Sequence, residues 1–302
     1  MSKAVEIHNL LKTYKNGTQA LKGVDLNIAE GDFFALLGAN GAGKTTIIGI
    51  LTGLVNKTSG DVSIFGLNQE THLDEIKKNI GVVPQEFNFS IFEKVIDIIV
   101  FQAGYFGMTK KQALIRAEEL LKALELWEKR DVISRTLSGG MKRRLMIARS
   151  LMHNPKLLIL DEPTAGVDVE LRFGMWNYLK KLNQNGTTIL LTTHYLEEVE
   201  QMCKNVAIIK DGQIIKNNSV KNMLMSIETE TYSVTIDKDL THYLLKELTA
   251  NKIDNNTFEI DLGKEFTVMD LTKYLEKNNY TILDIRPTGN RLEKLFLKSL
   301  KN

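Results

Sequence analysis

The stretch Phe33-Phe-Ala-Leu-Leu-Gly-Ala-Asn-Gly-Ala-Gly-Lys-Thr45 decides the fold of this chain. Its first five residues form a continuous apolar run, which is typical of a strand buried on both faces of a parallel sheet. The rest fits the pattern G-x-x-x-x-G-K-[ST], and an apolar helical pattern follows over residues 44–54. A strand, a glycine-rich loop and a helix in this order predict a phosphate-binding loop. A chance glycine-rich turn is the alternative, and about one random chain in a hundred of this length would match the pattern.

The residue types of this loop suit the binding of phosphate. Glycines let the backbone wrap closely around phosphate oxygens, while successive N–H groups and the helix N-terminus attract negative charge. Lys44 neutralises charge on the β- and γ-phosphates, and the hydroxyl of Thr45 is placed to ligate Mg²⁺. We therefore predict a nucleotide site that includes Gly38, Ala39, Asn40, Gly41, Ala42, Gly43, Lys44, Thr45 and Thr46.

A second apolar run, Leu157-Leu-Ile-Leu-Asp-Glu162, ends in two carboxylates and is typical of a Walker B strand. Asp161 is predicted to hold Mg²⁺, usually through a water of the ion. Glu162 is the candidate for polarising an attacking water. A solvated strand end is the alternative for an acidic pair by itself, and the phosphate-binding loop upstream favours the functional interpretation.

The segment Leu137-Ser-Gly-Gly-Met141 precedes a helical pattern. Ser138 is predicted to be the helix N-cap, and Gly139 and Gly140 leave backbone N–H groups accessible. Together they predict a second anion site that has no lysine, with an ordinary helix start as the alternative. We expect the basic run Lys142-Arg-Arg144 to be a solvated face, with interfacial salt bridges as the alternative.

These segments resemble the ATP-binding subunits of ABC transporters. The family's P-loop, Q-loop, signature, Walker B, D-loop and H-loop elements occur in that order within residues 1–215. The resemblance implies the α/β P-loop NTPase fold of an ABC ATPase, with a RecA-like parallel sheet, an antiparallel β subdomain and a helical subdomain. The commonest signature has Gln where this chain has Met141. That difference would remove a side-chain hydrogen bond to the ribose and leave the serine and backbone donors intact.

The resemblance assigns roles to further residues. Tyr14 matches the aromatic that stacks on adenine, with a surface or edge-strand aromatic as the alternative. Gln85 matches the Q-loop glutamine, which touches Mg²⁺ or the attacking water and couples the site to the membrane partner. Asp168 closes the D-loop and is alternatively, or in addition, a helix N-cap. His194 matches the switch histidine, which would hydrogen-bond the γ-phosphate and help to position Glu162.

The family's mechanism implies a head-to-tail homodimer or heterodimer. Each ATP would lie between the P-loop of one subunit and Ser138, Gly139 and Gly140 of the other. Residues near Gln85 and in the region 92–135 would receive helices of a separate integral membrane permease. The signature form, Arg143-Arg144 and the tail at 290–296 resemble the exporter-type (ABC-2) subfamily, whose members move drugs, lipids or polysaccharides outward in bacteria.

The composition indicates a folded, nearly neutral chain of 302 residues with 43% hydrophobic and 25% charged residues. Its formal net charge of +2 lacks the basic excess of most nucleic-acid-binding proteins, so no nucleic-acid partner is expected. The single Cys203 excludes an internal disulfide and fits a reducing compartment. Neither a spanning run of about 20 apolar residues nor a signal peptide is evident. We expect a cytoplasmic chain that is peripheral on the inner face of the cell membrane through the permease.

Two domains are predicted. Residues 1–219 form the ABC ATP-binding domain, with a helical subdomain over about 86–155 that includes a capping box at Thr109-Lys-Lys-Gln112. A hairpin is predicted to turn at Asp211-Gly212. Residues 220–302 alternate strand and helix patterns and predict a small α+β domain without catalytic residues, for interaction or regulation.

Two rival functions are weaker on this sequence. A soluble ABC ATPase acting on ribosomes or nucleic acid usually carries two ATP domains or a long coiled-coil insertion, and this chain has neither. A P-loop kinase for a small molecule would give the signature and H-loop elements no role.

Overall fold

The computed structural model describes residues 2–226, 229–289 and 291–301, which divide into two compact units, residues 1–220 and 221–302. The first unit is built on a six-stranded sheet in the order β10-β9-β3-β8-β7-β6. Its strands are β3 (Phe33–Leu37), β6 (Ile80–Val83), β7 (Leu157–Asp161), β8 (Thr188–Thr192), β9 (Asn205–Lys210) and β10 (Gln213–Ser219). All neighbours pair in parallel except β10, which pairs antiparallel with β9.

The apolar runs of the sequence explain the centre of this sheet. Every residue of β3, β7 and β8 is buried, as the continuous Leu, Ile and Phe content of these strands predicts. The predicted hairpin is also confirmed, because β9 and β10 turn at Asp211 and Gly212, both with positive φ. Three short, fully buried strands thus bring the sequence motifs that follow them to one edge of the sheet.

A separate antiparallel sheet, in the order β2-β1-β4-β5, lies at one end of the unit. It contains β1 (Lys3–Thr13), β2 (Gln19–Ala29), β4 (Ser59–Ile64) and β5 (Leu67–Asn68). Leu10, Leu26 and Ile64 from this sheet belong to the same buried cluster as Phe34 and Ile159 of the parallel sheet. The two sheets therefore share one hydrophobic core.

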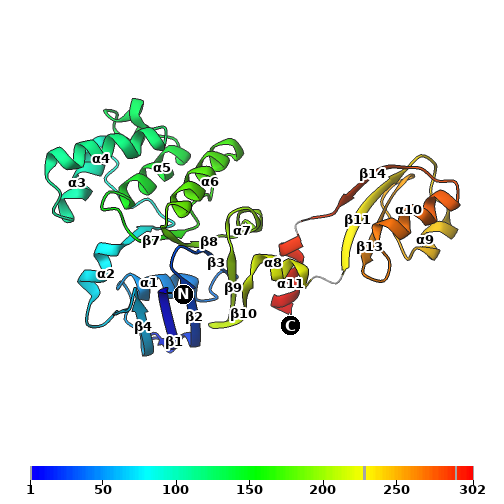
Figure 1. The fold of residues 1–302 in the computed structure, drawn as a ribbon, viewed down its shortest axis with the longest axis horizontal. Coiled ribbons are helices and arrows are strands. Elements are labelled where there is room, and N and C mark those ends of the chain that lie inside the picture. The colour runs from blue at the N-terminus through cyan, green and yellow to red at the C-terminus, as the bar shows by residue number, and fades with distance from the viewer. Residues whose placement is uncertain (1, 227–228, 290, 302) are drawn as a thin grey trace. The chain divides into compact units, whose positions relative to one another are not determined.

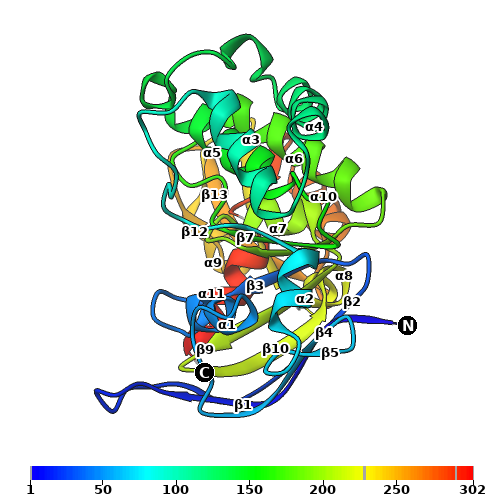
Figure 2. The same ribbon diagram turned by 90° about the vertical axis from the view of Figure 1, so that its left-hand side faces the viewer.

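Helices α3, α4 and α5 gather at the opposite end of the unit from β1 and β4, with the parallel sheet between them (Figure 1). Figure 2 shows the same order from the side. Their bounds are α3 (Val95–Tyr105), α4 (Lys110–Ala123) and α5 (Gly139–Ser150), with 3₁₀ turns at Trp127–Lys129 and Ser134–Thr136. The capping box predicted at Thr109 and Gln112 is confirmed at the start of α4.

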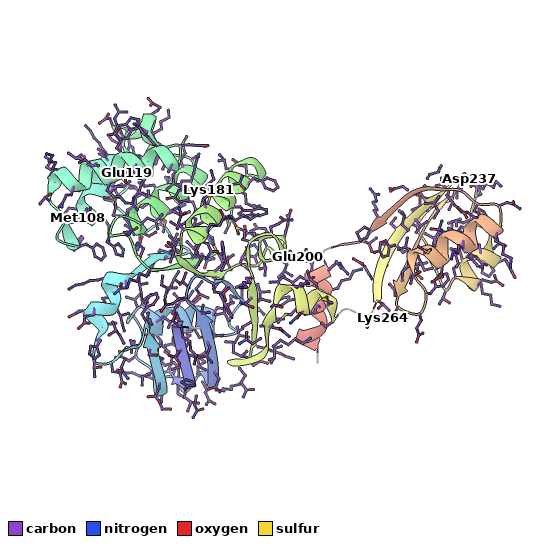
Figure 3. All side chains as sticks on the ribbon, viewed as in Figure 1. Met108, Glu119, Lys181, Glu200, Asp237 and Lys264 are labelled. Carbon is purple, nitrogen blue, oxygen red and sulfur yellow. The ribbon has the colours of Figure 1, made fainter. Side chains whose placement is uncertain are left out.

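The remaining helices of the first unit connect its strands. They are α1 (Lys44–Leu51), α2 (Leu73–Asn79), α6 (Val169–Gln184) and α7 (Leu196–Met202). Helix α8 (Val220–Met225) follows β10 and belongs, after its first residue, to the second unit. Side chains fill the space between these layers, with Glu119 on α4 and Lys181 on α6 (Figure 3). Within the described part of the chain, no helix combines the length and the apolar character needed to cross a membrane.

The second unit is a small α+β unit with a four-stranded antiparallel sheet in the order β12-β13-β11-β14. Its strands are β11 (Thr229–Ile236), β12 (Asn251–Lys252), β13 (Thr257–Gly263) and β14 (Ile282–Pro287), and its helices are α9 (His242–Glu247), α10 (Val268–Lys277) and α11 (Arg291–Lys301). A separate apolar cluster, including Ile236, Phe258 and Leu271, forms its core.

The close approach of β1 and β4 makes Gly60 a test of this packing. Gly60 has a φ of +94°, and a Cβ added there would lie 2.4 Å from the backbone oxygen of Asn9. We expect Gly60→Ala to lower the free energy of unfolding by about 3 kcal/mol, because overpacking adds to left-handed backbone strain. Urea denaturation would measure the loss.

The matched control is Gly66→Ala. Gly66 has a φ of +76° with no atom within 4 Å of the added Cβ, so only the backbone strain of about 1 kcal/mol applies. Equal losses for the two variants would contradict the close contact at Gly60.

Candidate active site

A cavity of about 630 Å³ lies where three parallel strands of the first unit end. Its lining comes from the loop after β3, the carboxyl end of β7 and the turn after β8. Gln85, which follows β6, also lines it. Ligands of open parallel sheets bind at this edge. The lining residues are Asn40, Gly41, Gly43, Lys44, Thr45, Thr46, Gln85, Asp161, Glu162 and His194. Four separate segments that the sequence predicted to be functional therefore meet in one place.

The phosphate-binding loop turns directly into α1. Gly43 is the N-cap of this helix with a φ of +116°, a backbone conformation that glycine adopts without strain. Lys44 is the first helical residue, and its side chain folds back so that Nζ donates to the backbone oxygens of Gly38 at 2.6 Å and Ala39 at 3.1 Å. The ammonium group is thus held at the loop, beside the N–H groups of the helix start.

The charge of Lys44 is balanced by the acidic side of the cavity. Lys44 is 8% exposed, and burial lowers its pKa. Attraction by Glu162 and Asp161 acts in the opposite direction. An anion held between the loop and these carboxylates would therefore meet a positive group already fixed in position.

Register between β7 and β8 fixes the two carboxylates. Asp161 pairs with Thr192, and the Thr192 hydroxyl donates to Asp161 Oδ1. The backbone N–H of Glu162 donates to Thr192 O at 3.0 Å. Glu162 has a φ of +48°, an uncommon conformation for a residue with a side chain, where the chain turns out of β7. Sequence reasoning missed Thr192, although its place at the end of an apolar strand was a usable signal.

Two side chains converge on Glu162. Its Oε2 accepts a hydrogen bond from Gln85 Nε2 at 3.3 Å and lies 3.2 Å from His194 Nδ1. The ring of His194 also packs on Tyr195, with 4.0 Å between the ring centroids. The structure thus brings the predicted base together with His194, which was predicted to position it, and with Gln85, which was predicted to touch Mg²⁺ or the attacking water.

Tyr14 lies beside the cavity rather than in its lining. Its hydroxyl is 3.3 Å from Thr46 Oγ1 at the start of α1, and Lys12 Nζ lies 4.8 Å from the centre of its ring. The ring therefore flanks the phosphate-binding loop.

The signature residues lie outside this cavity. Ser138 caps α5, as predicted, because its side chain accepts a hydrogen bond from Met141 N at 3.3 Å. Ser138 and Gly139 are exposed and Gly140 is buried. Asp168 is exposed at the N-cap position of α6 but makes no side-chain cap hydrogen bond, so helix capping by its carboxylate does not explain it.

The prediction of a solvated face for the basic run is wrong for Arg143 and Arg144. They are 4% and 7% exposed. Arg143 donates to the backbone oxygens of Pro84 and Gln85, both at 2.8 Å, and Arg144 donates to Leu124 O at 3.1 Å. Buried polar groups require hydrogen-bond partners, and these backbone carbonyls supply partners to the two guanidinium groups.

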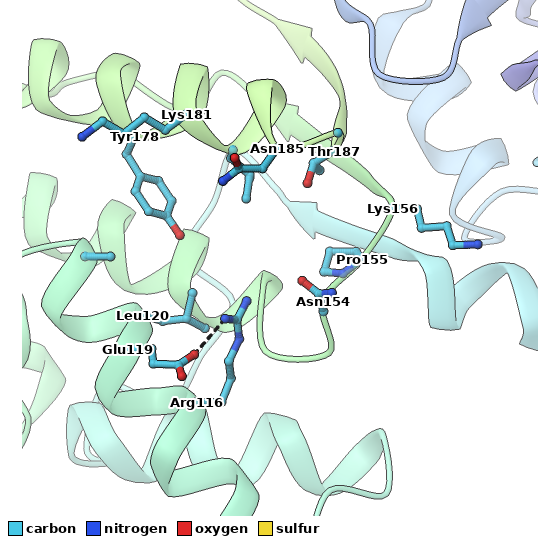
Figure 4. Close-up of a pocket in the computed structure, with 13 residues that line it drawn as sticks. Arg116, Glu119, Leu120, Asn154, Pro155, Lys156, Tyr178, Lys181, Asn185 and Thr187 are labelled. Carbon is cyan, nitrogen blue, oxygen red and sulfur yellow. Dashed lines mark hydrogen bonds and ion pairs between the residues drawn. The ribbon is translucent and has the colours of Figure 1, made fainter. Parts of the chain in front are cut away.

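A larger cavity of about 660 Å³ lies at the other ends of β7 and β8, next to α4 and α6. Figure 4 shows that Arg116 is paired with Glu119 and that the side chain of Lys156 points away from the space. Arg116 is therefore engaged by a carboxylate, and Lys156 is directed out of this space.

Comparison with known proteins agrees with this geometry. The family profile described as ABC transporter matches residues 21–165. The chain is 32% identical to the linearmycin resistance ATP-binding protein LnrL of Bacillus subtilis, over 97% of both chains. It is 37% identical to the Nod factor export ATP-binding protein I of Cupriavidus metallidurans, over 75% of this chain and 74% of that one. It is 36% identical to the daunorubicin/doxorubicin resistance ATP-binding protein DrrA of Streptomyces peucetius, over 75% of this chain and 68% of that one.

Solved structures confirm the predicted fold class. A dimeric post-hydrolysis state of the ATP-binding cassette MJ0796, bound to ADP and Pi, superposes with a TM-score of 0.67 at 31% identity, over 72% of this chain and 98% of that one. The structure of cbiO1 from Clostridium perfringens gives a TM-score of 0.69 at 29% identity, over 75% of this chain and 92% of that one.

The role of Lys44 can be tested by binding. We expect Lys44→Ala to raise the Kd for ATP by about 10- to 100-fold, because a hydrogen bond to a charged group contributes about 1.5–3 kcal/mol. Titration calorimetry would measure the affinity. Lys156→Ala is the control, since Lys156 lies over the Phe65 ring and away from this cavity. Equal affinities of the Lys44→Ala variant and the unchanged protein would contradict the assignment.

Proposed function

The chain belongs to the ABC transporter family as an ATP-hydrolysing subunit of the exporter type, and from that premise we propose how its residues, its dimer and its membrane partner act. The observation that carries the proposal is the meeting of Lys44, Glu162 and His194 in one cavity at the ends of parallel strands. ATP binding and hydrolysis then drive export of a substrate through a separate membrane subunit. The exporter-type relatives do not favour the alternative of a soluble ATPase acting on ribosomes.

The phosphate-binding loop holds the nucleotide. Residues 38–46 surround the phosphates with backbone N–H groups, and Lys44 contacts the β- and γ-phosphates. Tyr14 stacks on the adenine, a role that its place beside Thr46 supports. Because stacking uses the flat face of the ring, it needs no base-specific hydrogen bond.

The oxygen donors in the cavity fit Mg²⁺. The Thr45 hydroxyl, the Asp161 carboxylate and the Gln85 amide all line it, and oxygen is the ligand that this ion prefers. Bound there with the nucleotide, Mg²⁺ would neutralise charge on the phosphates. Thr192 keeps Asp161 in place through its hydroxyl hydrogen bond.

Glu162 accepts the proton of the attacking water. Its carboxylate is largely shielded from solvent and lies within reach of both Gln85 and His194. Gln85 and His194 orient this carboxylate and the water, while Lys44 stabilises negative charge that develops on the γ-phosphate. Positioning and electrostatics account for most of the catalysis in such phosphoryl transfers.

The complete site requires a second subunit. Ser138 and Gly139 are exposed at the start of α5 and lie outside the chain's own cavity. In a head-to-tail homodimer or heterodimer, Ser138, Gly139 and Gly140 of one subunit bind the γ-phosphate held by the other, with Asp168 at the interface. A relative with 31% identity forms a dimer, which supports this arrangement.

The groove that follows Gln85 is proposed to receive a helix of the membrane subunit. This groove, of about 600 Å³, is lined by Asn88, Phe89, Ser90, Glu93, Asp97, Ile98, Phe101, Gln102, Tyr105 and Arg149. Phe101 and Tyr105 are 68% and 74% exposed and stack edge to face. Their apolar surface, next to the carboxylates of Glu93 and Asp97, suits a helix that presents bulky apolar side chains and a basic residue. The chain would thereby lie on the cytoplasmic face of the membrane.

We infer the type of cargo and the role of the second unit from the relatives. These are named for Nod factor export and for resistance to linearmycin or daunorubicin, so the proposed cargo is a drug, lipid or polysaccharide type of molecule. The match to LnrL covers 97% of this chain and therefore includes most of residues 221–302. We assign an interaction or regulatory role to that unit.

The shared site is tested with a hydrolysis-deficient variant. We expect Glu162→Gln to lower the ATPase rate by about 10²- to 10⁴-fold, since proton transfer is lost, and to accumulate as a dimer with ATP. Size-exclusion chromatography with light scattering would detect the dimer.

The matched control adds Ser138→Arg to Glu162→Gln. The arginine would occupy the place of the partner's phosphate, so the double variant should bind ATP and stay monomeric. An ATP-dependent dimer of this double variant would refute the shared site.

The membrane partner is tested by gentle solubilisation and isolation of the tagged, full-length chain. A multi-spanning membrane protein should be isolated with it at near-equal stoichiometry, and Phe101→Glu should abolish that association by placing a carboxylate beside Glu93 and Asp97. Leu54→Glu, at an exposed leucine outside the groove, is the control. Isolation of ribosomes or of soluble proteins alone would overturn the transport proposal.

A further inference from the structure

Arg143 is a buried charge that the mechanism above does not use. It lies on α5, five residues after Ser138, and is almost completely buried. Its Nη1 donates to Pro84 O and its Nη2 to Gln85 O, both at 2.8 Å. Its Cζ lies 5.1 Å from the centre of the Phe87 ring. One guanidinium group therefore holds the two backbone carbonyls that come before and after the Cα of Gln85. It also contacts the ring of Phe87.

The geometry of these contacts is specific to arginine. The planar guanidinium reaches two neighbouring carbonyls with parallel N–H groups, which a lysine ammonium on a flexible chain does not reproduce. Burial lowers the pKa of Arg143, and attraction by Asp161 and Glu162 opposes this effect. The same charge is thus attracted by the two acidic residues of the active site, while its Nη groups donate to the backbone oxygens of Pro84 and Gln85.

The position of Arg143 on α5 connects two different sites. The start of this helix, at Ser138 and Gly139, is the proposed contact with the nucleotide of the other subunit. Slightly more than one helical turn later, Arg143 holds the glutamine that donates to Glu162 in its own subunit. A helix of this length moves as a rigid element, so a displacement of its N-terminus is passed to the Gln85 backbone.

We propose that Arg143 is a positioning residue that ties the signature helix to Gln85, so that binding of the partner's nucleotide at Ser138 sets the position of Gln85 in the subunit's own site. This inference rests on the proposed function, since it needs the head-to-tail dimer. Arg149, further along α5, donates to Asn88 O at 3.0 Å and extends the same attachment to the groove. The two ATP sites are then coupled through α5 and not only through the shared interface.

The neighbouring Arg144 provides a matched control. It lies on the same helix and is nearly as buried, but it donates to Leu124 O and Glu125 Oε2 in the helical region. Arg144→Lys and Arg143→Lys therefore shorten equally buried arginines, and only the second change removes a bond to the Gln85 backbone.

The first experiment compares the ATPase kinetics of the full-length variants. Arg143→Lys should lower kcat about tenfold, shift the KM for ATP less than twofold and bring the Hill coefficient for ATP close to one. Arg144→Lys should retain kcat and cooperativity to within about twofold. Equal kcat for Arg143→Lys and the unchanged protein, or an equal loss in both lysine variants, would overturn the proposal.

A double-variant cycle with Gln85→Ala separates positioning from general destabilisation. If Arg143 acts through Gln85, adding Arg143→Lys to Gln85→Ala should lower kcat no further, because residues in one network are not additive. Multiplicative losses would refute the proposal. If the protein without any substitution shows no ATPase activity, the proposed function itself is refuted. The two failures are therefore distinguishable.

Discussion

The pairing of β7 with β8 is the constraint on which the rest of the site depends. It sets Asp161 opposite Thr192 and lets the next residue, Glu162, bond to the same threonine through its backbone N–H. Both carboxylates are thereby placed at one edge of the sheet, facing the loop that follows β3. A shift of one residue in this pairing would move the carboxylate of Asp161 to the other face of the sheet, away from Lys44. Complete burial of both strands makes such a shift costly.

Buried charges of both signs meet around this edge. Lys44 on one side and Arg143 on the other are both stabilised by Asp161 and Glu162, yet their donors go to backbone carbonyls. A carboxylate pair without these cations would be expensive to keep out of water. The cations would be equally expensive alone, because burial disfavours their charge. The proposed function and the stability of this edge would therefore depend on the same four side chains, and Arg143, the cation on α5, is the one that contacts the segment after β6.

Local motifs made most of the site predictable. The phosphate-binding loop carries its own geometry in its glycines, and the parallel strands bring Asp161 and His194 to the same edge whatever the loops between them do. The places of Arg143 and Thr192 were not predictable in this way. A basic pair on a helix looks the same in sequence whether it is solvated or buried, and the acceptors of Arg143 lie 59 and 58 residues away. Only the packing of α5 against the segment after β6 decides between these environments.

In the proposed dimer, each ATP site is divided between the surfaces of two subunits, and the direction of α5 explains this division. A helix can offer its N-terminus to an anion only at one end, and here that end is exposed with Ser138 while the body of the helix is buried against the chain's own segment at 84–88. The exposed end is left without an anion from its own chain, because the nearest phosphate-binding loop faces the cavity with Glu162. In the proposed head-to-tail dimer, a second subunit would supply a phosphate to this end of the helix, while the buried part contacts the backbone of Gln85, whose side chain donates to Glu162. Under this proposal assembly and catalysis would be coupled, since the contact that closes the dimer would also set the position of the residue that contacts Glu162.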